Sequence, residues 1–129
     1  VLRHLIGILR NKDTDMATFR ETANRISRIL AVYATAHLPE INTEVETPLQ
    51  RCSQKRIVTQ IIACPILRAG LAMLDAFLDL HPNSRVFHIG LKRDESTHQP
   101  IAYYRNFEHA DGDTRVFLLD PMLATGGSL

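Results

Sequence analysis

The sequence has little cysteine and almost no net charge, and each of these features excludes a class of protein. Its 129 residues include only two cysteines, Cys52 and Cys64, which are not spaced as C-x-x-C. Two thiols cannot build the disulfide framework of a small secreted domain, so we expect both to be reduced. The net charge of +1 provides no overall field to attract nucleic acid or an anionic membrane. We therefore expect a cytoplasmic protein with neither of these as a partner.

The patterns of several common ligand sites are also missing. The six histidines are scattered and form no close group with cysteines or carboxylates, so no protein-built metal site is expected. Neither the P-loop spacing G-x-x-x-x-G-K-[ST] nor the dinucleotide spacing G-x-G-x-x-G occurs. The apolar run in VLRHLIGILR is shorter than a membrane span. Any anion must therefore be bound by a local group of another kind.

The composition present is that of one ordinary globular domain. Hydrophobic residues make up 45% and charged residues 22% of the chain, which argues against disorder. The length is close to the commonest size of a domain. We predict a single domain over 1–129, with an N-terminal helix and arm over 1–56 and an α/β core over 57–129 that carries a flap and a phosphate loop.

A helix is expected after the turn-like NKDTD. Apolar or aromatic residues and one histidine follow in alternating steps of four and three, at Phe19, Ala23, Ile26, Leu30, Tyr33 and His37. This spacing is the stripe of an amphipathic helix. Thr14 or Asp15 is the expected N-cap, and Pro39 ends the helix because the residue before proline disfavours helical geometry. A solvated face opposite the stripe is expected to carry the basic residues Arg20, Arg25 and Arg28.

The rest of the chain alternates between extended and helical patterns. INTEVETPL predicts an extended arm, and RCSQKR a turn after it. The apolar run RIVTQIIACPI, the helical AGLAMLDAFLDL and the apolar SRVFHIGL form a βαβ unit with parallel strands. We therefore predict an α/β fold with helices on both faces of a mostly parallel sheet. Residues 92–107 are expected to form a hairpin flap, and RVFLLD a third buried strand.

The segment DPMLATGGS is the most informative part of the sequence. Asp120 ends an apolar strand, and ligands of open parallel sheets bind at that end. Gly126 and Gly127 let the backbone approach a phosphate closely, and Thr125 and Ser128 add hydroxyl donors. The loop therefore resembles an anion cradle, although an isolated Thr-Gly-Gly-Ser is more often a simple turn.

This segment is accompanied by other motifs along the chain, and together they resemble one protein family. An acid, a short apolar spacer and T-G-G-S directly after a buried strand are similar to the diphosphoribosyl-binding signature of phosphoribosyltransferases. With proline after the acid, the segment specifically resembles uracil phosphoribosyltransferases. ETPL at 46–49, PILRAG at 65–70 and GLKRD at 90–94, followed by Tyr103-Tyr104, match that family in the same order. The resemblance covers essentially all 129 residues.

The resemblance implies a site and an activity. The family transfers ribose 5-phosphate from phosphoribosyl diphosphate to uracil, which gives uridine monophosphate and diphosphate in pyrimidine salvage. By resemblance Asp120 holds the ribose hydroxyls, and Arg68 and Arg93 hold the diphosphate. The substrate-binding loop then comprises Pro121, Met122, Leu123, Ala124, Thr125, Gly126, Gly127 and Ser128. From the residues alone, Arg68 after a buried strand favours a phosphate contact over a surface ion pair, whereas Arg93 beside Asp94 fits a local salt bridge equally well.

The resemblance also implies partners and a departure from the family. Magnesium is expected as a complex with the substrate diphosphate, and the protein is expected to be a homo-oligomer, with the ETPL arm in the contact and a purine nucleotide such as GTP as regulator. The chain stops at Leu129, before the helix that should complete the phosphate loop and before the uracil-reading segment. We therefore expect a C-terminally truncated domain that is inactive alone. A non-catalytic nucleotide-binding regulator of the same fold and an inactive truncated homologue are the alternatives.

Overall fold

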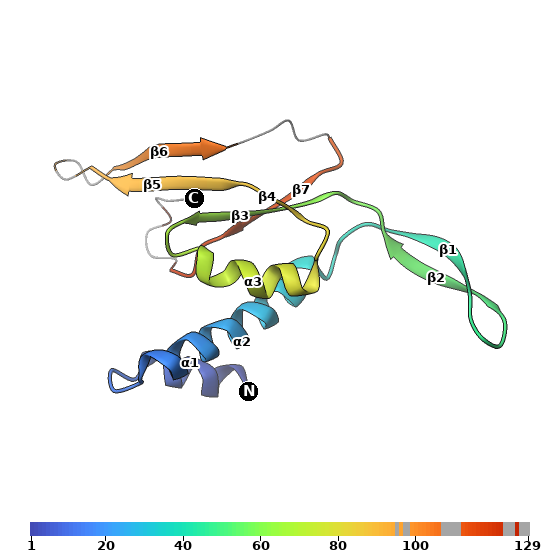
Figure 1. Cartoon of the computed structure of the whole chain (residues 1–129), viewed down its shortest axis with the longest axis horizontal. Helices are drawn as coiled ribbons and strands as arrows, with labels where there is room; N and C mark the ends of the chain where they lie inside the picture. Colours follow the sequence, from blue (N-terminus) through green and yellow to red (C-terminus); the bar gives the residue numbers. More distant parts are fainter. Residues whose placement is uncertain (95, 97–98, 107–111, 123–125, 127–129) are drawn as a thin grey trace.

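The protein consists of stacked helices on a small sheet, with a two-stranded arm that extends away from this body (Figure 1). The computed structural model describes residues 1–94, 96, 99–106, 112–122 and 126. The described helices are α1 (Leu2–Arg10), α2 (Met16–Thr35) and α3 (Leu71–Leu80). Helix α1 packs on α2, α2 packs on α3, and α3 packs on the sheet. The sequence pattern predicts α2 and α3 but not α1.

The predicted start of α2 is confirmed by its cap. Asp15 is the N-cap, and its Oδ1 accepts hydrogen bonds from the backbone N–H groups of Ala17 at 2.9 Å and Thr18 at 3.0 Å. The hydroxyl of Thr18 also donates to Asp15 Oδ2 at 2.6 Å. These bonds satisfy donors that have no partner inside the helix, so the cap fixes where α2 begins.

This cap gives a pH-dependent prediction. The hydrogen bonds from Thr18, its side chain first, lower the pKa of Asp15 below its ordinary value of 3.8. A carboxylate whose pKa is lower in the folded than in the unfolded state stabilises the protein at pH values above the unfolded-state pKa. This contribution is lost as the pH falls through the folded-state pKa. We expect Asp15→Ala to lower the melting temperature at neutral pH and to matter less below pH 3.8. Melting curves of both proteins across acidic pH measure this, and a pH-independent difference would contradict the role of the charge.

The predicted apolar stripe of α2 is wrong. The buried side chains of the helix are the small residues Thr22, Ser27, Ala31 and Thr35. Of the predicted stripe, Phe19 is 45% exposed, Leu30 45% and Tyr33 74%. Ser27 and Thr35 donate their hydroxyls to carbonyls one turn earlier, so these polar side chains can be buried at no loss of hydrogen bonds. Ser27, Ala31 and Thr35 share one face of the helix, so α2 buries a face of small residues, whereas Thr22 is buried on the opposite side.

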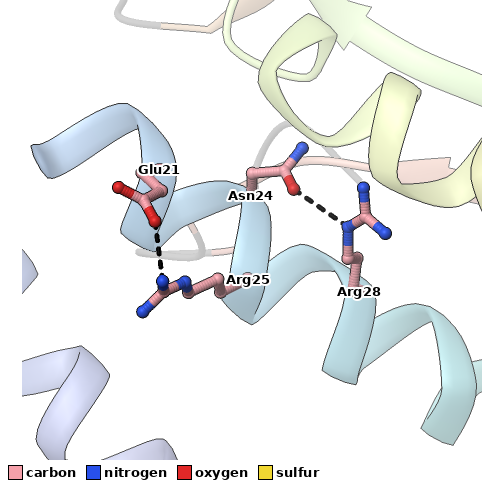
Figure 2. A network of polar contacts seen from close by, with 4 residues as sticks. All are labelled: Glu21, Asn24, Arg25 and Arg28. Carbon is pink, nitrogen blue, oxygen red and sulfur yellow. Dashed lines mark hydrogen bonds and ion pairs between the residues drawn. The ribbon is translucent and has the colours of Figure 1, made fainter. Parts of the chain in front are cut away.

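The arginines of α2 differ from the predicted solvated face in one respect. Arg25 forms an exposed pair with Glu21 at 2.6 Å, and Arg28 Nε donates to Asn24 at 3.0 Å (Figure 2). Arg28 also forms an ion pair with Asp79 of α3. Arg28 therefore lies at the rim of the α2–α3 contact, whereas the partner of Arg25 among the described residues is on its own helix. Exposed pairs of this kind contribute little to stability.

The arm is a hairpin of β1 (Glu40–Glu46) and β2 (Arg51–Ile57), paired antiparallel from Glu40↔Ile57 to Glu46↔Arg51. The extended arm is confirmed, but the prediction of a turn for RCSQKR is wrong because these residues lie in β2. The turn lies at 47–50, where the Thr47 hydroxyl accepts from Gln50 N and donates to Gln50 O. Most arm side chains are exposed, so no alternation of buried residues revealed the second strand.

The body of the sheet is built around β3 (Ile61–Leu67). On one side β3 pairs in parallel with β7 (Arg115–Leu119), and on the other with β4 (Arg85–Val86) and β5 (His88–Arg93). The flap strand β6 (Pro100–Asn106) is antiparallel to β5. The predicted parallel βαβ unit and hairpin flap are confirmed, as is the mixed α/β fold class. The third strand is confirmed, but the prediction that it is buried is wrong: only Leu119 of β7 is buried, because among the described strands β7 pairs with β3 alone. The first core strand begins at Ile61, later than the apolar pattern indicated.

Two apolar clusters lie on opposite faces of β3. One joins Ala63 and Leu119 of the sheet to Phe77 of α3 and Ala31 of α2. The other comprises Ile62, Cys64 and Phe87, with Ile89 against it. The described helices all stack outward from the first face, whereas the sequence predicted helices on both. Both cysteines are free, as expected, and burial raises the pKa of the Cys64 thiol.

Candidate functional site

The candidate site lies where the parallel strands β3 and β7 end. Pro65 of β3 is level with Leu119 of β7, so the residues that follow the two strands emerge at the same edge of the sheet. Arg68 follows β3 and Asp120 follows β7. Carboxyl ends of parallel strands are the usual place for a ligand in such sheets. The structure thus brings together two of the residues that the sequence indicated.

A polar cavity of about 210 Å³ occupies this edge. Its described lining comes from the ends of β3, β5 and β7 and the start of β6: Ile66, Leu67, Arg68, Ala69, Leu91, Lys92, Pro100, Asp120 and Met122. A larger cavity of about 390 Å³ lies between α2, α3 and β7, but its described lining has no charged side chain. The smaller cavity is therefore the better candidate for a charged ligand.

The charged groups of the cavity suit an anion that also carries hydroxyls. Arg68 and Lys92 provide two cations, and Asp120 provides one carboxylate. Among the described residues Arg68 has no salt-bridge partner, so the alternative of a surface ion pair has no support there. Asp120 is half-buried, and its Oδ1 accepts a 3.3 Å hydrogen bond from Met122 N, which turns the chain away from the strand.

Gly70 fixes the close approach of the two strand ends. Its N–H donates to Ile66 O at 2.8 Å, which makes a tight turn between β3 and α3. A Cβ added at Gly70 would lie 2.6 Å from Ile66 N and 2.8 Å from Ile66 O, and closer still to Leu119 O. All three neighbours are backbone atoms, so only glycine fits. The peptide bond between Leu67 and Arg68, inside this turn, is cis.

The other predicted site residues are only partly described. Gly126 has φ +77, the left-handed region that favours glycine, which agrees with a turn that needs this residue. Pro121 and Met122 are exposed, and Met122 reaches the cavity. Arg93 ends β5 opposite Pro100, but its side chain lies outside the described part. Also outside it are Leu123, Ala124, Thr125, Gly127 and Ser128, so the phosphate cradle stays a prediction.

Lys92 is the charged lining residue that the sequence motifs do not single out. It precedes Arg93 in GLKRD, and the family resemblance points to the arginine. The flap strand contributes Pro100, whereas Tyr103 and Tyr104 are not among the described lining residues. Tyr103 instead covers Gly90, where an added Cβ would lie 2.5 Å from its ring. A basic pair at the end of a predicted strand was the signal available for Lys92.

The described part of the chain shows neither a metal cluster nor a membrane-spanning helix. Among the described residues no three His, Cys, Asp or Glu side chains converge in a way that could hold a metal ion. Of the helices in the described part, none has the length and apolar character to cross a membrane.

Known proteins match the chain along its whole length. The family model described as uracil phosphoribosyltransferase matches residues 1–129. The uracil phosphoribosyltransferase of Acholeplasma laidlawii is 40% identical over 128 residues, which is 99% of this chain and 62% of that protein. That of Symbiobacterium thermophilum is 42% identical over 130 residues, 100% of this chain and 62% of the relative.

A solved structure agrees with these sequence matches. The AQ2163 protein from Aquifex aeolicus superposes with a TM-score of 0.86 at 33% identity, over 98% of this chain and 61% of that one. The chain therefore spans about three fifths of the length of the relatives it matches.

Proposed function

This chain belongs to the uracil phosphoribosyltransferase family, and from that membership we propose that the protein transfers ribose 5-phosphate from phosphoribosyl diphosphate to uracil. The products are uridine monophosphate and diphosphate, so the reaction serves pyrimidine salvage. The observation that supports the proposal most is the cavity at the strand ends, where Arg68 and Asp120 face one space. The cations suit the phosphates of the substrate, and the acid suits its ribose hydroxyls.

The proposed reaction depends on electrostatic stabilisation of the transition state and not on covalent catalysis. The bond between ribose C1 and the diphosphate oxygen breaks, the bond from C1 to uracil N1 forms, and the N1 proton is released. Positive charge develops on the sugar and negative charge on the leaving diphosphate. Arg68 would hold the leaving group, while the carboxylate of Asp120 would accept hydrogen bonds from the ribose and face the cationic ring. No nucleophilic side chain is required.

Magnesium is part of the proposal as a companion of the substrate. Mg²⁺ prefers oxygen ligands, uses few protein carboxylates and commonly binds through substrate phosphates. The donors here fit that mode, because Asp120 is the single acidic side chain in the described lining. When bound, the metal would neutralise charge on the diphosphate oxygens. Arg93 and the loop from Pro121 to Ser128 complete the proposed binding set.

A base-selectivity assay tests the function. The protein that contains residues 1–129 is incubated with phosphoribosyl diphosphate, magnesium and one base, and nucleotide formation is followed for uracil, cytosine, adenine and hypoxanthine. We expect product with uracil alone. Binding of phosphoribosyl diphosphate without product from any base would favour the regulator, and neither binding nor product would favour an inactive homologue.

Arg68 gives a quantitative prediction. We expect Arg68→Ala to weaken binding of phosphoribosyl diphosphate about 10- to 150-fold, because a hydrogen bond to a charged group contributes ~1.5–3 kcal/mol. Isothermal calorimetry measures the dissociation constant. The matched control is Arg25→Ala, which removes an exposed arginine paired with Glu21 on the same helix and should leave affinity unchanged. Equal affinity of Arg68→Ala and the parent would remove Arg68 from the site.

We also propose a homo-oligomer that uses the arm. In the described structure β1 and β2 contact each other and no further helix or strand. An isolated two-stranded hairpin is marginally stable in water, so the arm needs a surface to pack against. Val45, 36% exposed on this arm, offers an apolar contact. Sedimentation of Val45→Asp beside the parent tests this, and an unchanged mass would contradict it.

Two family properties complete the proposal. We propose a purine nucleotide such as GTP as a regulator and the cytoplasm as the location, and both are supported by family membership. Uracil turnover measured with and without GTP tests the regulator, and fractionation of the source cells tests the location.

A further inference from the structure

The end of β5 carries a cation that no matched motif assigns to the site. We infer that Lys92 binds the diphosphate together with Arg68, as a cation for the leaving group in addition to the proposed Arg93. This inference rests on the proposed function and adds a residue to the same site. It follows from the position of Lys92, from the charges around the cavity, and from the needs of a diphosphate.

Strand pairing places Lys92 and Arg68 at the same edge of the sheet. In the parallel ladder between β3 and β5, Leu67 is level with Gly90. Arg68 is the first residue after β3, and Lys92 lies in β5, two positions beyond Gly90. Neighbouring strands of a sheet are about 5 Å apart, so the two positions are close in space. Both residues line the 210 Å³ cavity.

The charges of the cavity favour an anion between these side chains. Arg68 and Lys92 oppose a single carboxylate, Asp120, in the described lining. Neither cation forms a salt bridge with a described residue. Like charges that share a small cavity repel each other, and a bound anion relieves this repulsion. An exposed lysine is ordinary on a protein surface, but a lysine that shares a cavity with a second unpaired cation indicates an anionic ligand.

The chemistry of the leaving group favours a further cation. A diphosphate carries several negative charges, so Lys92 adds to the positive charge that Arg68 and the proposed Arg93 supply. Arginine provides a rigid fork for two phosphate oxygens, whereas lysine is a compact charge on a flexible stem. Because the side chain of Lys92 is exposed, its ammonium group is free to follow the diphosphate as it departs. Arg68 would thus fix the orientation, and Lys92 would add charge.

Two substitutions separate charge from shape. Lys92→Met removes the charge at similar length, and Lys92→Arg keeps the charge. Lys55→Met is the matched control, since Lys55 is an exposed strand lysine on the arm, opposite Asn42. Binding of inorganic diphosphate to the protein that contains residues 1–129 is measured by calorimetry at two salt concentrations. Melting temperatures of all three variants should equal that of the parent, because the side chains are exposed.

We expect Lys92→Met to weaken diphosphate binding about tenfold and to reduce its salt dependence. Lys92→Arg and Lys55→Met should bind as the parent does. Unchanged binding by Lys92→Met would overturn the inference, as would equal losses in Lys92→Met and Lys92→Arg or a parent that does not bind diphosphate. A parent that makes uridine monophosphate while Lys92→Met binds normally would refute the role of Lys92 alone. A parent that binds diphosphate through Lys92 but makes no product would refute the transferase instead.

Discussion

Gly70→Ala is expected to lower the free energy of unfolding by about 3 kcal/mol or more, at the upper end of overpacking effects. The new methyl group would lie 2.6 Å from Ile66 N and 2.8 Å from Ile66 O, and still closer to Leu119 O. These atoms belong to the backbones of β3 and β7, which cannot separate without breaking their ladder. Such a loss is a large part of the roughly 5–15 kcal/mol that stabilises a typical domain.

Urea denaturation of the variant and the parent measures this effect. Gly7→Ala is a sharp control, because a Cβ at Gly7 would meet no atom within 4 Å. Gly7 lies inside α1 and is exposed. Alanine favours a helix over glycine by about 0.5–1 kcal/mol, so the control should gain stability. If Gly70→Ala unfolded at the same urea concentration as the parent, the close contact between the turn and β7 would be refuted.

The same contact accounts for the position of the site. Because Gly70 has no side chain, the turn after β3 packs directly against Leu119 at the end of β7. Arg68 belongs to this turn and Asp120 follows Leu119, so the contact sets the positions of both residues at the cavity. A displaced turn would move the guanidinium away from the carboxylate. We therefore expect any folded fraction of Gly70→Ala to bind diphosphate more weakly than the parent does.

Features with a local cause were predictable from the sequence. Asp15 caps α2 because a short polar side chain just before a helix can accept from its first N–H groups. The strand β3 was predictable because a strand buried on both faces forms a continuous apolar run. The apolar run of β7 also indicated a strand, although only Leu119 of it is buried. Arg68 and Asp120 followed from the rule that ligands bind at the carboxyl ends of such strands.

Features that depend on tertiary contacts were not predictable in this way. Helix α2 offers two faces, and the one with Ser27 and Ala31 packs inward because its small side chains admit α3. The more apolar face, with Leu30 and Tyr33, had the stronger periodicity in the sequence. Likewise, Lys92 and Arg93 are adjacent basic residues that the sequence pattern does not distinguish. Only the described cavity lining shows that Lys92 reaches the site.

Asp120→Asn is expected to reduce turnover on the order of 100-fold with little change in stability. Under the proposed mechanism the carboxylate accepts hydrogen bonds from the ribose and faces the positive charge that develops on the sugar. The amide keeps the shape and one oxygen, so it can still accept the 3.3 Å hydrogen bond from Met122 N. The turn after β7 should therefore persist while the negative charge is lost, and the loss should appear mainly in kcat because that charge matters most in the transition state.

Steady-state kinetics with uracil and thermal melting, measured on the same preparations, separate the two roles of the carboxylate. Asp113→Asn is the matched control, because it makes the same charge change in the exposed turn before β7, at the other end of that strand. The control should keep both kcat and melting temperature. If Asp120→Asn kept near-parental kcat while its melting temperature fell, Asp120 would act as a cap of the strand end. In that case the charge stabilisation in the cavity would come from the cations, including Arg68 and Lys92. A carboxylate that faces the sugar would be excluded from the mechanism.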